Sequence, residues 1–483
     1  MKRLSFLFAI VVALSAVFAV GCANKKSARS CYDLSLSYED GVLDGSLDFT
    51  FYNATDTAVK ELKFNIYPNA YREGAKYTPV AASDGAGAYY AGKSYGGIEI
   101  ESVAVKNETA AYEIGGEDEN ILIVPLGAEI FPGERCALAI DFTVRLAKIN
   151  HRLGITQGGT VNLANFYPVL CGYDNGFYEC VYYSAGDPFF SECADYNVRF
   201  TADEKYVVAS SGVVAASSTE NGKTTYTYRL KNARDFALAL NENFETMSAK
   251  AGDVTVSYYY VKDASPVRSM DFAVKAVTTF SDMFGAYPYD TLSVVETGFN
   301  EGGMEYPALV YISDRLDEAS YGEVIVHETA HQWWYASVGN NEIESPFLDE
   351  GLAEYSVVLF YEANEGLGMT RPQMIEAAEM TYRTYCNVYD QLFGKVDTTM
   401  LRPLGEYSSE YEYVNIAYIK SCLMFEHLRV GIGDGMFFKG LKKYYADNAY
   451  SVARPEDLVG AFEKCGADTN GFFESFFDGS AII

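Results

Sequence analysis

The stretch "VIVHETAHQWWYASVGNNEIESPFLDEGLAEY", residues 324–355, carries two of the four histidines in this chain of 483 residues. His327 and His331 lie four residues apart, and Glu328 follows the first of them. Residues at positions i and i+4 of an α-helix share one face, so both imidazoles can reach a single ion. This H-E-x-x-H arrangement is typical of a helical zinc site in which the glutamate is the general base.

The neighbouring residues predict where two helices around this motif begin and end. Ser320 and Glu323 fit a capping box at the start of the first helix, and Gly339 is a plausible end for it. Ser345 as N-cap and Pro346 at the first helical position predict the start of a second helix.

A catalytic zinc ion needs a third protein ligand and one open position. Glu350 follows His331 after 18 intervening residues and lies in the first turns of the second predicted helix. We therefore predict that His327, His331 and Glu350 bind one Zn²⁺ per chain. A ligand imidazole usually needs an acceptor for its other nitrogen. Glu354, one turn after Glu350, is a candidate for that role, and a solvated surface carboxylate is the equal alternative.

Composition and charge narrow the class of protein. Apolar residues make up 49% of the chain and charged residues 21%, which is typical of a globular protein. There are 37 basic and 66 acidic residues, which gives a net charge of -29. Because nucleic-acid binding requires a basic surface, this balance argues against a nucleic-acid partner. The sequence does not set the oligomeric state.

The N-terminus predicts export. A basic "MKR" precedes the apolar run "LSFLFAIVVALSAVFAV", and small residues follow. We interpret residues 1–21 as a signal peptide, with a retained membrane-anchor helix as the alternative. "AVGC" resembles the lipobox of bacterial lipoproteins, so Cys22 is a candidate for lipidation, with cleavage by an ordinary signal peptidase as the other route. Residues 22–30 would then be a polar tether on the outer face of the bacterial cytoplasmic membrane. The eight other cysteines leave disulfide pairing open.

The periodicity of the sequence divides the remaining chain in two. Residues 31–247 contain short runs of alternating polar and apolar residues, such as "YDLSLSY" and "CALAIDFTVRL", between turn residues. This pattern predicts an antiparallel β domain of sandwich or saddle shape. From residue 248 onward, after one more strand ("VTVSYYYV"), helical spacing prevails, as in "SPVRSMDFAVKAVTTFSDMFG" and "ARPEDLVGAFEKCG".

Several motifs together resemble the gluzincin metallopeptidases of the aminopeptidase N type. "HETAH", 18 residues and "DEG" match the family's H-E-x-x-H and N-E-G elements in order and spacing. "GGMEYP" at 302–307 resembles the family's G-A-M-E-N, and "AYIKS" resembles its tyrosine-x-lysine-glycine element. "NFYPVL" and "GDPFFSECADYNVRF" are similar to the family's β domain. The resemblance implies a β domain followed by a thermolysin-like, mainly helical zinc peptidase domain at residues 248–483.

The resemblance also implies roles for individual residues. Tyr418 would be the catalytic tyrosine, and Glu305 would bind the free α-ammonium of the substrate. Gly302, Gly303 and Met304 would lie along the substrate. The chain departs from the family at Tyr306, Gly303, Asp349 and Ser421, and no counterpart is evident for the β-domain glutamine or glutamate that helps to hold the substrate amine.

These residue types suit the hydrolysis of a peptide bond. Zinc can lower the pKa of a bound water towards about 7. Glu328 would then take the water's proton and pass it to the leaving amine. The hydroxyl of Tyr418 can donate to the developing oxyanion, with Tyr413 or Tyr411 as alternative donors. His151 and His427 have no motif around them, and we interpret both as structural.

We therefore expect a zinc aminopeptidase that trims peptides outside the cytoplasmic membrane. The first alternative is an endopeptidase on the same site, which would apply if Glu305 does not bind the substrate amine. The second alternative is a zinc-dependent peptide-binding lipoprotein without turnover. The presence of Glu328 argues against this last alternative, because a protein that only binds peptides needs no general base.

Overall fold

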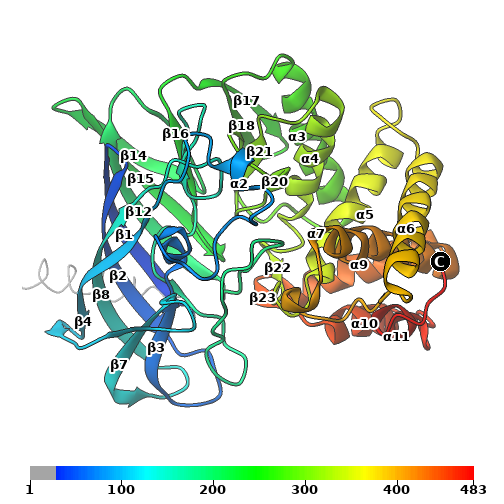
Figure 1. Cartoon of the computed structure of the whole chain (residues 1–483), viewed down its shortest axis with the longest axis horizontal. Coiled ribbons are helices and arrows are strands. Elements are labelled where there is room, and N and C mark those ends of the chain that lie inside the picture. The colour runs from blue at the N-terminus through cyan, green and yellow to red at the C-terminus, as the bar shows by residue number, and fades with distance from the viewer. Residues whose placement is uncertain (1–28) are drawn as a thin grey trace, which may run out of the picture.

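The computed structural model describes residues 29–483, so Cys22 and the predicted signal peptide lie outside the described residues. The chain forms a β-rich half, coloured blue to green in Figure 1, beside a mainly helical half, coloured green to red. This arrangement confirms the predicted fold class. Buried apolar side chains form one continuous cluster across both halves. Among residues 29–483, no helix combines the length and the apolar character that crossing a membrane requires.

The β-rich half is built on a sheet of eight strands with two smaller sheets. In spatial order, the strands of the large sheet are β14 (Val213–Glu220), β15 (Lys223–Ala233), β12 (Ala194–Asp203), β1 (Cys31–Glu39), β2 (Val42–Tyr52), β8 (Arg135–Arg145), β4 (Gly97–Val105) and β5 (Glu108–Thr109). All neighbours pair antiparallel except β1 and β12. Buried and exposed residues alternate along β1 and β8, as the sequence pattern predicts.

Two four-stranded sheets complete the β-rich half. One runs β13 (Val207–Ser210), β16 (Leu238–Asn241), β10 (Val161–Leu163), β9 (Gly154–Ile155), and the other runs β11 (Val169–Leu170), β3 (Val59–Asn65), β7 (Ile121–Ile130), β6 (Glu113–Gly115). The short helices η1 (Tyr67–Tyr71) and α2 (Gly85–Ala88) lie in its connections.

The second half begins with a sheet of five strands. Their order is β17 (Glu245–Ala251), β18 (Val254–Tyr260), β19 (Thr291–Thr297), β21 (Leu309–Ser313) and β20 (Gly303–Met304). The predicted boundary at residue 248 falls inside β17. β20 is the edge strand and lies within the "GGMEYP" motif. An edge strand exposes unpaired backbone groups, which an extended peptide can use.

Helices make up the rest of this half. They are α3 (Pro266–Met283), α4 (Glu318–Ala330), α5 (Phe347–Ala363), α6 (Arg371–Phe393), η2 (Leu404–Glu406), α7 (Glu410–Tyr413), the π-helix η3 (Val414–Lys420), α8 (Ser421–Ile432), α9 (Asp434–Asn448), α10 (Pro455–Lys464) and α11 (Phe472–Phe477). A short pair of strands, β22 (Val338–Gly339) and β23 (Ser451–Val452), joins distant parts of this half. The helices predicted from "SPVRSMDFAVKAVTTFSDMFG" and "ARPEDLVGAFEKCG" are α3 and α10.

The bounds predicted for the two motif helices were wrong in detail. α4 begins one turn earlier than the capping box at Ser320 implies, because the carboxylate of Asp317 accepts the backbone N–H groups of Ala319 and Ser320. α4 ends at Ala330, and Gly339 lies in β22 instead.

The start of α5 is also shifted, by one residue. Pro346 is its N-cap, and the first helical residue is Phe347. Ser345 therefore lies before the cap, and its carbonyl accepts from the amide of Asn340.

Arg234 joins the two halves. It is 2% exposed, and its guanidinium donates to the carbonyls of Ser191, Tyr335, Ser337 and Ser451. A Cβ atom at position 339 would lie 1.9 Å from Cζ of Arg234, so only glycine fits there. The β-rich half thus contributes a charged side chain to the turn that follows the metal-motif helix.

Candidate metal centre and peptide cleft

Three side chains, from α4, its C-cap and α5, converge on one point. Nε2 of His327 and Nε2 of His331 are 3.1 Å apart, and they lie 3.2 and 3.3 Å from Oε2 of Glu350. A tetrahedral zinc ion with bonds of 2.0–2.1 Å places neighbouring ligand atoms about 3.3 Å apart. The three donor atoms therefore fit the predicted zinc ion without rearrangement, and their N₂O donor set is typical of catalytic zinc.

The outer nitrogens of both histidines have acceptors. Nδ1 of His327 is 3.3 Å from Oε2 of Glu354, and Nδ1 of His331 is 2.9 Å from the carbonyl oxygen of Trp334. When an ion is bound, a proton on Nδ1 would leave the lone pair of Nε2 of each imidazole for the ion, whereas without an ion Nε2 can donate to Glu350. Glu354 thus lies where the sequence reasoning expected an acceptor.

Glu350 is held as a carboxylate. Burial alone would favour its protonated form, but hydrogen bonds from His327 and His331 outweigh burial and hold its pKa well below the usual range. A metal ligand must be deprotonated, so this arrangement prepares the residue for a cation.

Glu328 lies beside the centre on α4 and lines the cavity in front of it. Its side chain is buried, and Oε2 has no hydrogen-bond partner. Burial raises the pKa of Glu328 to about 7, although the charges of the nearby His327 and His331 lower it. An unpaired buried carboxylate facing a metal site is free to accept a proton from a water molecule there.

The "GGMEYP" strand packs against Glu328. A Cβ atom on Gly303 would lie 2.3 Å from Oε1 of Glu328, whereas one on Gly302 would meet nothing closer than 3.7 Å. Both glycines line the cavity, but Gly303 also makes room for the Glu328 carboxylate. The side chain of Met304 is buried with Sδ against Nε of Arg152, and it does not line the cavity.

Tyr418 approaches the centre from the π-helix η3. Its hydroxyl donates to Oε1 of Glu350, and its ring stacks on that of His327 with centroids 5.9 Å apart. π-helical turns are rare and often occur at functional sites. Tyr413 lines the same cavity, whereas Tyr411 is 46% exposed and packs on α6. Tyr418 therefore contacts two of the predicted metal ligands, Glu350 and His327.

Glu305 lies just beyond β20, and its carboxylate is buried in the cavity wall with Oε1 unpartnered. Burial raises its pKa to about 8, and the charges of Glu328 and Glu350 add to this effect. Carboxylate oxygens of Glu342 and Asp349 lie within 4.8 Å of Glu305 and of each other. A cation in front of Glu305 would favour its ionised form.

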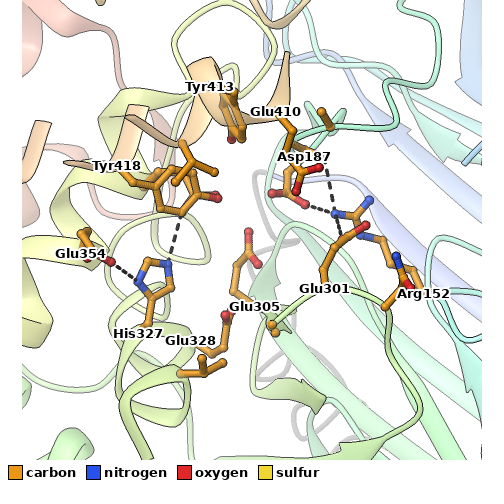
Figure 2. Close-up of a pocket in the computed structure, with 18 of the residues that line it drawn as sticks. Arg152, Asp187, Glu301, Glu305, His327, Glu328, Glu354, Glu410, Tyr413 and Tyr418 are labelled. Atoms are coloured by element: carbon orange, nitrogen blue, oxygen red, sulfur yellow. Dashed lines mark hydrogen bonds and ion pairs between the residues drawn. The ribbon is translucent and has the colours of Figure 1, made fainter. Parts of the chain in front are cut away.

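The β-rich half also contributes to this cavity, which the sequence alone did not predict. Asp187, in the "GDPFF" segment, and Arg152 line it, and they form an ion pair of 2.5 Å. Arg152 also lies 3.5 Å from Glu301, which precedes the "GGMEYP" strand. Figure 2 shows Glu305 and Glu328 in the middle of the cavity, with His327 and Glu354 on one side and Asp187 and Arg152 on the other. The "GDPFF" likeness was the available signal, but it gave no position in space.

His151 also has a definite place near this cavity. Its Nε2 is 3.5 Å from Oε1 of Glu301, and its Nδ1 is 2.7 Å from the hydroxyl of Tyr71. It therefore supports the segment that precedes β20.

Comparison with known proteins agrees with this geometry. Residues 268–476 match the model of the peptidase family M1 domain. The chain is 28% identical to an aminopeptidase N of Streptomyces lividans over 215 residues, which are 41% of this chain and 24% of that protein. It is 24% identical to an aminopeptidase N of Lactococcus lactis subsp. lactis over 44% of this chain and 26% of that protein. The chain thus matches about a quarter of the length of these relatives.

Solved structures extend the match to the β-rich half. The M1 zinc metallopeptidase of Deinococcus radiodurans superposes with a TM-score of 0.66 at 17% identity, covering 94% of both chains. A mutant of that protein bound to a Tyr-Ser-Ala substrate gives a TM-score of 0.66 at 18% identity, again over 94% of both chains. The fold of residues 29–483 is therefore that of the M1 zinc metallopeptidases, in agreement with the resemblance to the aminopeptidase N type.

Proposed function

We propose, from the peptidase family M1 domain at residues 268–476, that this chain is a zinc-dependent aminopeptidase that removes N-terminal residues from peptides. The observation that carries the proposal is the convergence of His327, His331 and Glu350 in front of the unpaired carboxylate of Glu328. One Zn²⁺ per chain, held by those three residues, would acidify a water molecule and polarise the scissile carbonyl.

The residues of the chain supply the remaining steps. Glu328 accepts the proton of the attacking water and delivers it to the leaving amine. The hydroxyl of Tyr418 donates to the carbonyl oxygen as negative charge develops on it. β20 is the edge strand and aligns the peptide beside Glu328.

Recognition of the free amine separates an aminopeptidase from an endopeptidase. Glu305 presents an unpartnered oxygen to the cavity, and a charge-assisted bond from an α-ammonium would satisfy it. Asp187 lies across the cavity on the β-rich half and is our candidate for the second contact to the amine.

The proposal is tested by comparing peptides that have a free amine with their N-acetylated forms. The wild-type protein should strongly prefer the free amine. Glu305→Gln should lower kcat/KM for free-amine peptides by about tenfold to a hundredfold, the cost of one charge-assisted contact. Equal rates on both kinds of peptide in the wild type would instead make the protein an endopeptidase.

A second measurement separates catalysis from peptide binding without turnover. Glu328→Gln should retain about one zinc ion per chain and lose nearly all hydrolysis, because the amide cannot accept the proton. A wild-type protein that binds zinc and peptide but releases no product would favour the peptide-binding alternative.

In this proposal the protein is exported and held by a lipid on Cys22 at the outer face of the bacterial cytoplasmic membrane. The support is the sequence of residues 1–22. Arg29, the first described residue, donates to the carbonyl of Tyr450 and so joins the predicted tether to the folded part of the chain. Cys22→Ser should move the protein from the membrane fraction to the soluble fraction of cells, and mass spectrometry of the N-terminus should find no acyl chain.

A further inference from the structure

The cavity of about 400 Å³ in front of the metal ligands is strongly acidic. Nine of its lining residues are Asp or Glu, and Arg152 is the only Lys or Arg among those that the structure describes. The mechanism uses only some of these carboxylates. The lining carboxylates to which no role has yet been given are Asp84, Glu301, Glu323 and Glu410.

Ion pairs compensate part of this charge. Arg152 pairs with Asp187 and lies 3.5 Å from Glu301, and Glu354 faces His327. Asp84, Glu323 and Glu410 form no ion pair with any Lys or Arg in residues 29–483. A substrate that enters the cavity thus meets several negative charges that have no protein cation.

Three of these carboxylates form a group that we term the acidic rim: Asp84, Glu301 and Glu410. They come from separate parts of the chain, namely the segment beside α2, the segment before β20 and the start of α7. All three side chains line the same cavity, and burial together with the charges of Asp84 and Glu301 raises the pKa of Glu410. Figure 2 shows Glu410 and Glu301 on the same side of the cavity as Asp187.

An unpartnered hydroxyl faces the same part of the cavity. Tyr413 is 3% exposed, lines the cavity and has no hydrogen-bond partner for its hydroxyl. A Cβ atom on Gly186 would lie 3.0 Å from that hydroxyl, so the tyrosine lies beside the "GDPFF" segment. A buried hydroxyl without a partner is costly, and a donor group of a substrate would satisfy it.

The position of the acidic rim identifies the part of the substrate that reaches it. Glu305 and Asp187, our candidates for binding the α-ammonium, lie beside the rim. The amine and the side chain of the first residue leave the same Cα atom. The side chain of the first residue is therefore the part of a bound peptide that comes closest to Asp84, Glu301 and Glu410.

We infer that the acidic rim selects peptides whose first residue carries a positive charge, lysine or arginine. This inference rests on the proposed aminopeptidase activity and names its substrate class. The ammonium or guanidinium of the first side chain would donate to the rim carboxylates and to the Tyr413 hydroxyl. An acidic first residue would meet like charges and be cleaved poorly.

The experiment uses fluorogenic amides of lysine, norleucine and glutamate, because norleucine has a straight apolar side chain close to that of lysine in length. The wild-type kcat/KM should be about tenfold higher for lysine than for norleucine at low ionic strength, and lowest for glutamate. The lysine preference should fall as salt is raised, because the rim is open to solvent.

Substitutions in the acidic rim test whether its carboxylates cause the preference for lysine. Glu410→Gln and Asp84→Asn should each lower the lysine-to-norleucine ratio by about two- to fivefold. Glu113→Gln, an exposed carboxylate on β6 away from the cavity, is the matched control and should leave the ratio unchanged.

The possible results distinguish a failure of the proposed charge selectivity from a failure of the proposed aminopeptidase activity. Hydrolysis of norleucine amide at a rate equal to or above that of lysine amide would overturn the inference and leave the aminopeptidase intact. A lysine preference that survives both rim substitutions would overturn the role of the rim. Absence of hydrolysis of all three amides, with zinc bound, would overturn the proposed function and the inference together.

Discussion

Tyr418 donates a hydrogen bond to Oε1 of Glu350, the carboxylate whose other oxygen faces both His327 and His331. The hydroxyl therefore lies next to the point where a bound carbonyl oxygen would meet the ion. Tyr418 belongs to the π-helix Val414–Lys420, which is distant in sequence from the H-E-x-x-H motif. The geometry of that turn places the hydroxyl beside Glu350.

Tyr418→Phe should lower kcat by about two to three powers of ten, the usual cost of one oxyanion donor. KM should change little, because the bond strengthens only as charge develops on the oxygen. Steady-state kinetics on one free-amine peptide measures both parameters. Tyr411→Phe is the control, since that ring lies outside the cavity. A larger loss in Tyr413→Phe than in Tyr418→Phe would transfer the role to Tyr413.

Glu354→Ala should weaken zinc binding by about tenfold to a hundredfold, because Nδ1 of His327 loses its acceptor. Competition with a chelator of known affinity measures the effect. Glu376→Ala, an exposed carboxylate on α6, should not change zinc affinity. Unaltered zinc affinity in Glu354→Ala would show that the residue is only a solvated surface acid.

Gly303→Ala should reduce kcat by about tenfold or more while zinc content stays at the wild-type level. The added methyl group would displace the Glu328 carboxylate, and a shift of about 1 Å in a catalytic group can cost a hundredfold. Gly302→Ala offers a close comparison, because a methyl group there meets nothing nearer than 3.7 Å. Equal activity of the two variants would contradict the steric argument.

Asp235 should make stability depend on pH away from the active site. It is 2% exposed, and burial raises its pKa from 3.8 to about 7. Between about pH 4 and 7 the folded chain therefore binds a proton that the unfolded chain releases, so this residue's contribution to stability falls as pH rises through that window. Asparagine does not ionise and can still accept from Tyr335 and Asn165.

Relative to wild type, the Tm of Asp235→Asn should therefore rise by about 2 °C or more when pH is raised from 5 to 8. Thermal unfolding at the two pH values tests this. Asp48→Asn, at an exposed position on β2, should show no such relative rise. A constant difference between Asp235→Asn and wild type would mean that Asp235 is already ionised at pH 5.

The convergence of His327, His331 and Glu350 could be predicted from the sequence because local geometry determines most of it. Helical periodicity alone places His327 and His331 on one face, and Glu354 follows Glu350 by one turn on the next helix. Strand alternation identified the β-rich half in the same way. The exact helix starts were less predictable, because Asp317 competes with Ser320 as the cap and the sequence does not show which one wins.

The residues that the β-rich half contributes to the cavity could not be predicted from local sequence patterns. Arg152 and Asp187 come from loops of the β-rich half, and tertiary packing alone brings them to Glu301. The same is true of Glu342, whose carboxylate lies near Glu305 and Asp349 without any motif spacing. No sequence pattern predicts the π-helical turn that positions Tyr418. The only signal for this tyrosine is the likeness of "AYIKS" to the tyrosine-x-lysine-glycine element.

The hydrogen bonds of the Arg234 guanidinium affect the order in which parts of the chain can fold during synthesis. Its carbonyl acceptors come from Ser191, from the turn after α4 and from Ser451 on β23. The ribosome releases Arg234 long before Ser451. A nascent chain that already holds His327, His331 and Glu350 must still wait for Ser451 before this guanidinium is fully enclosed. Late truncations should therefore yield chains that bind metal but remain prone to proteolysis at the junction between the two halves.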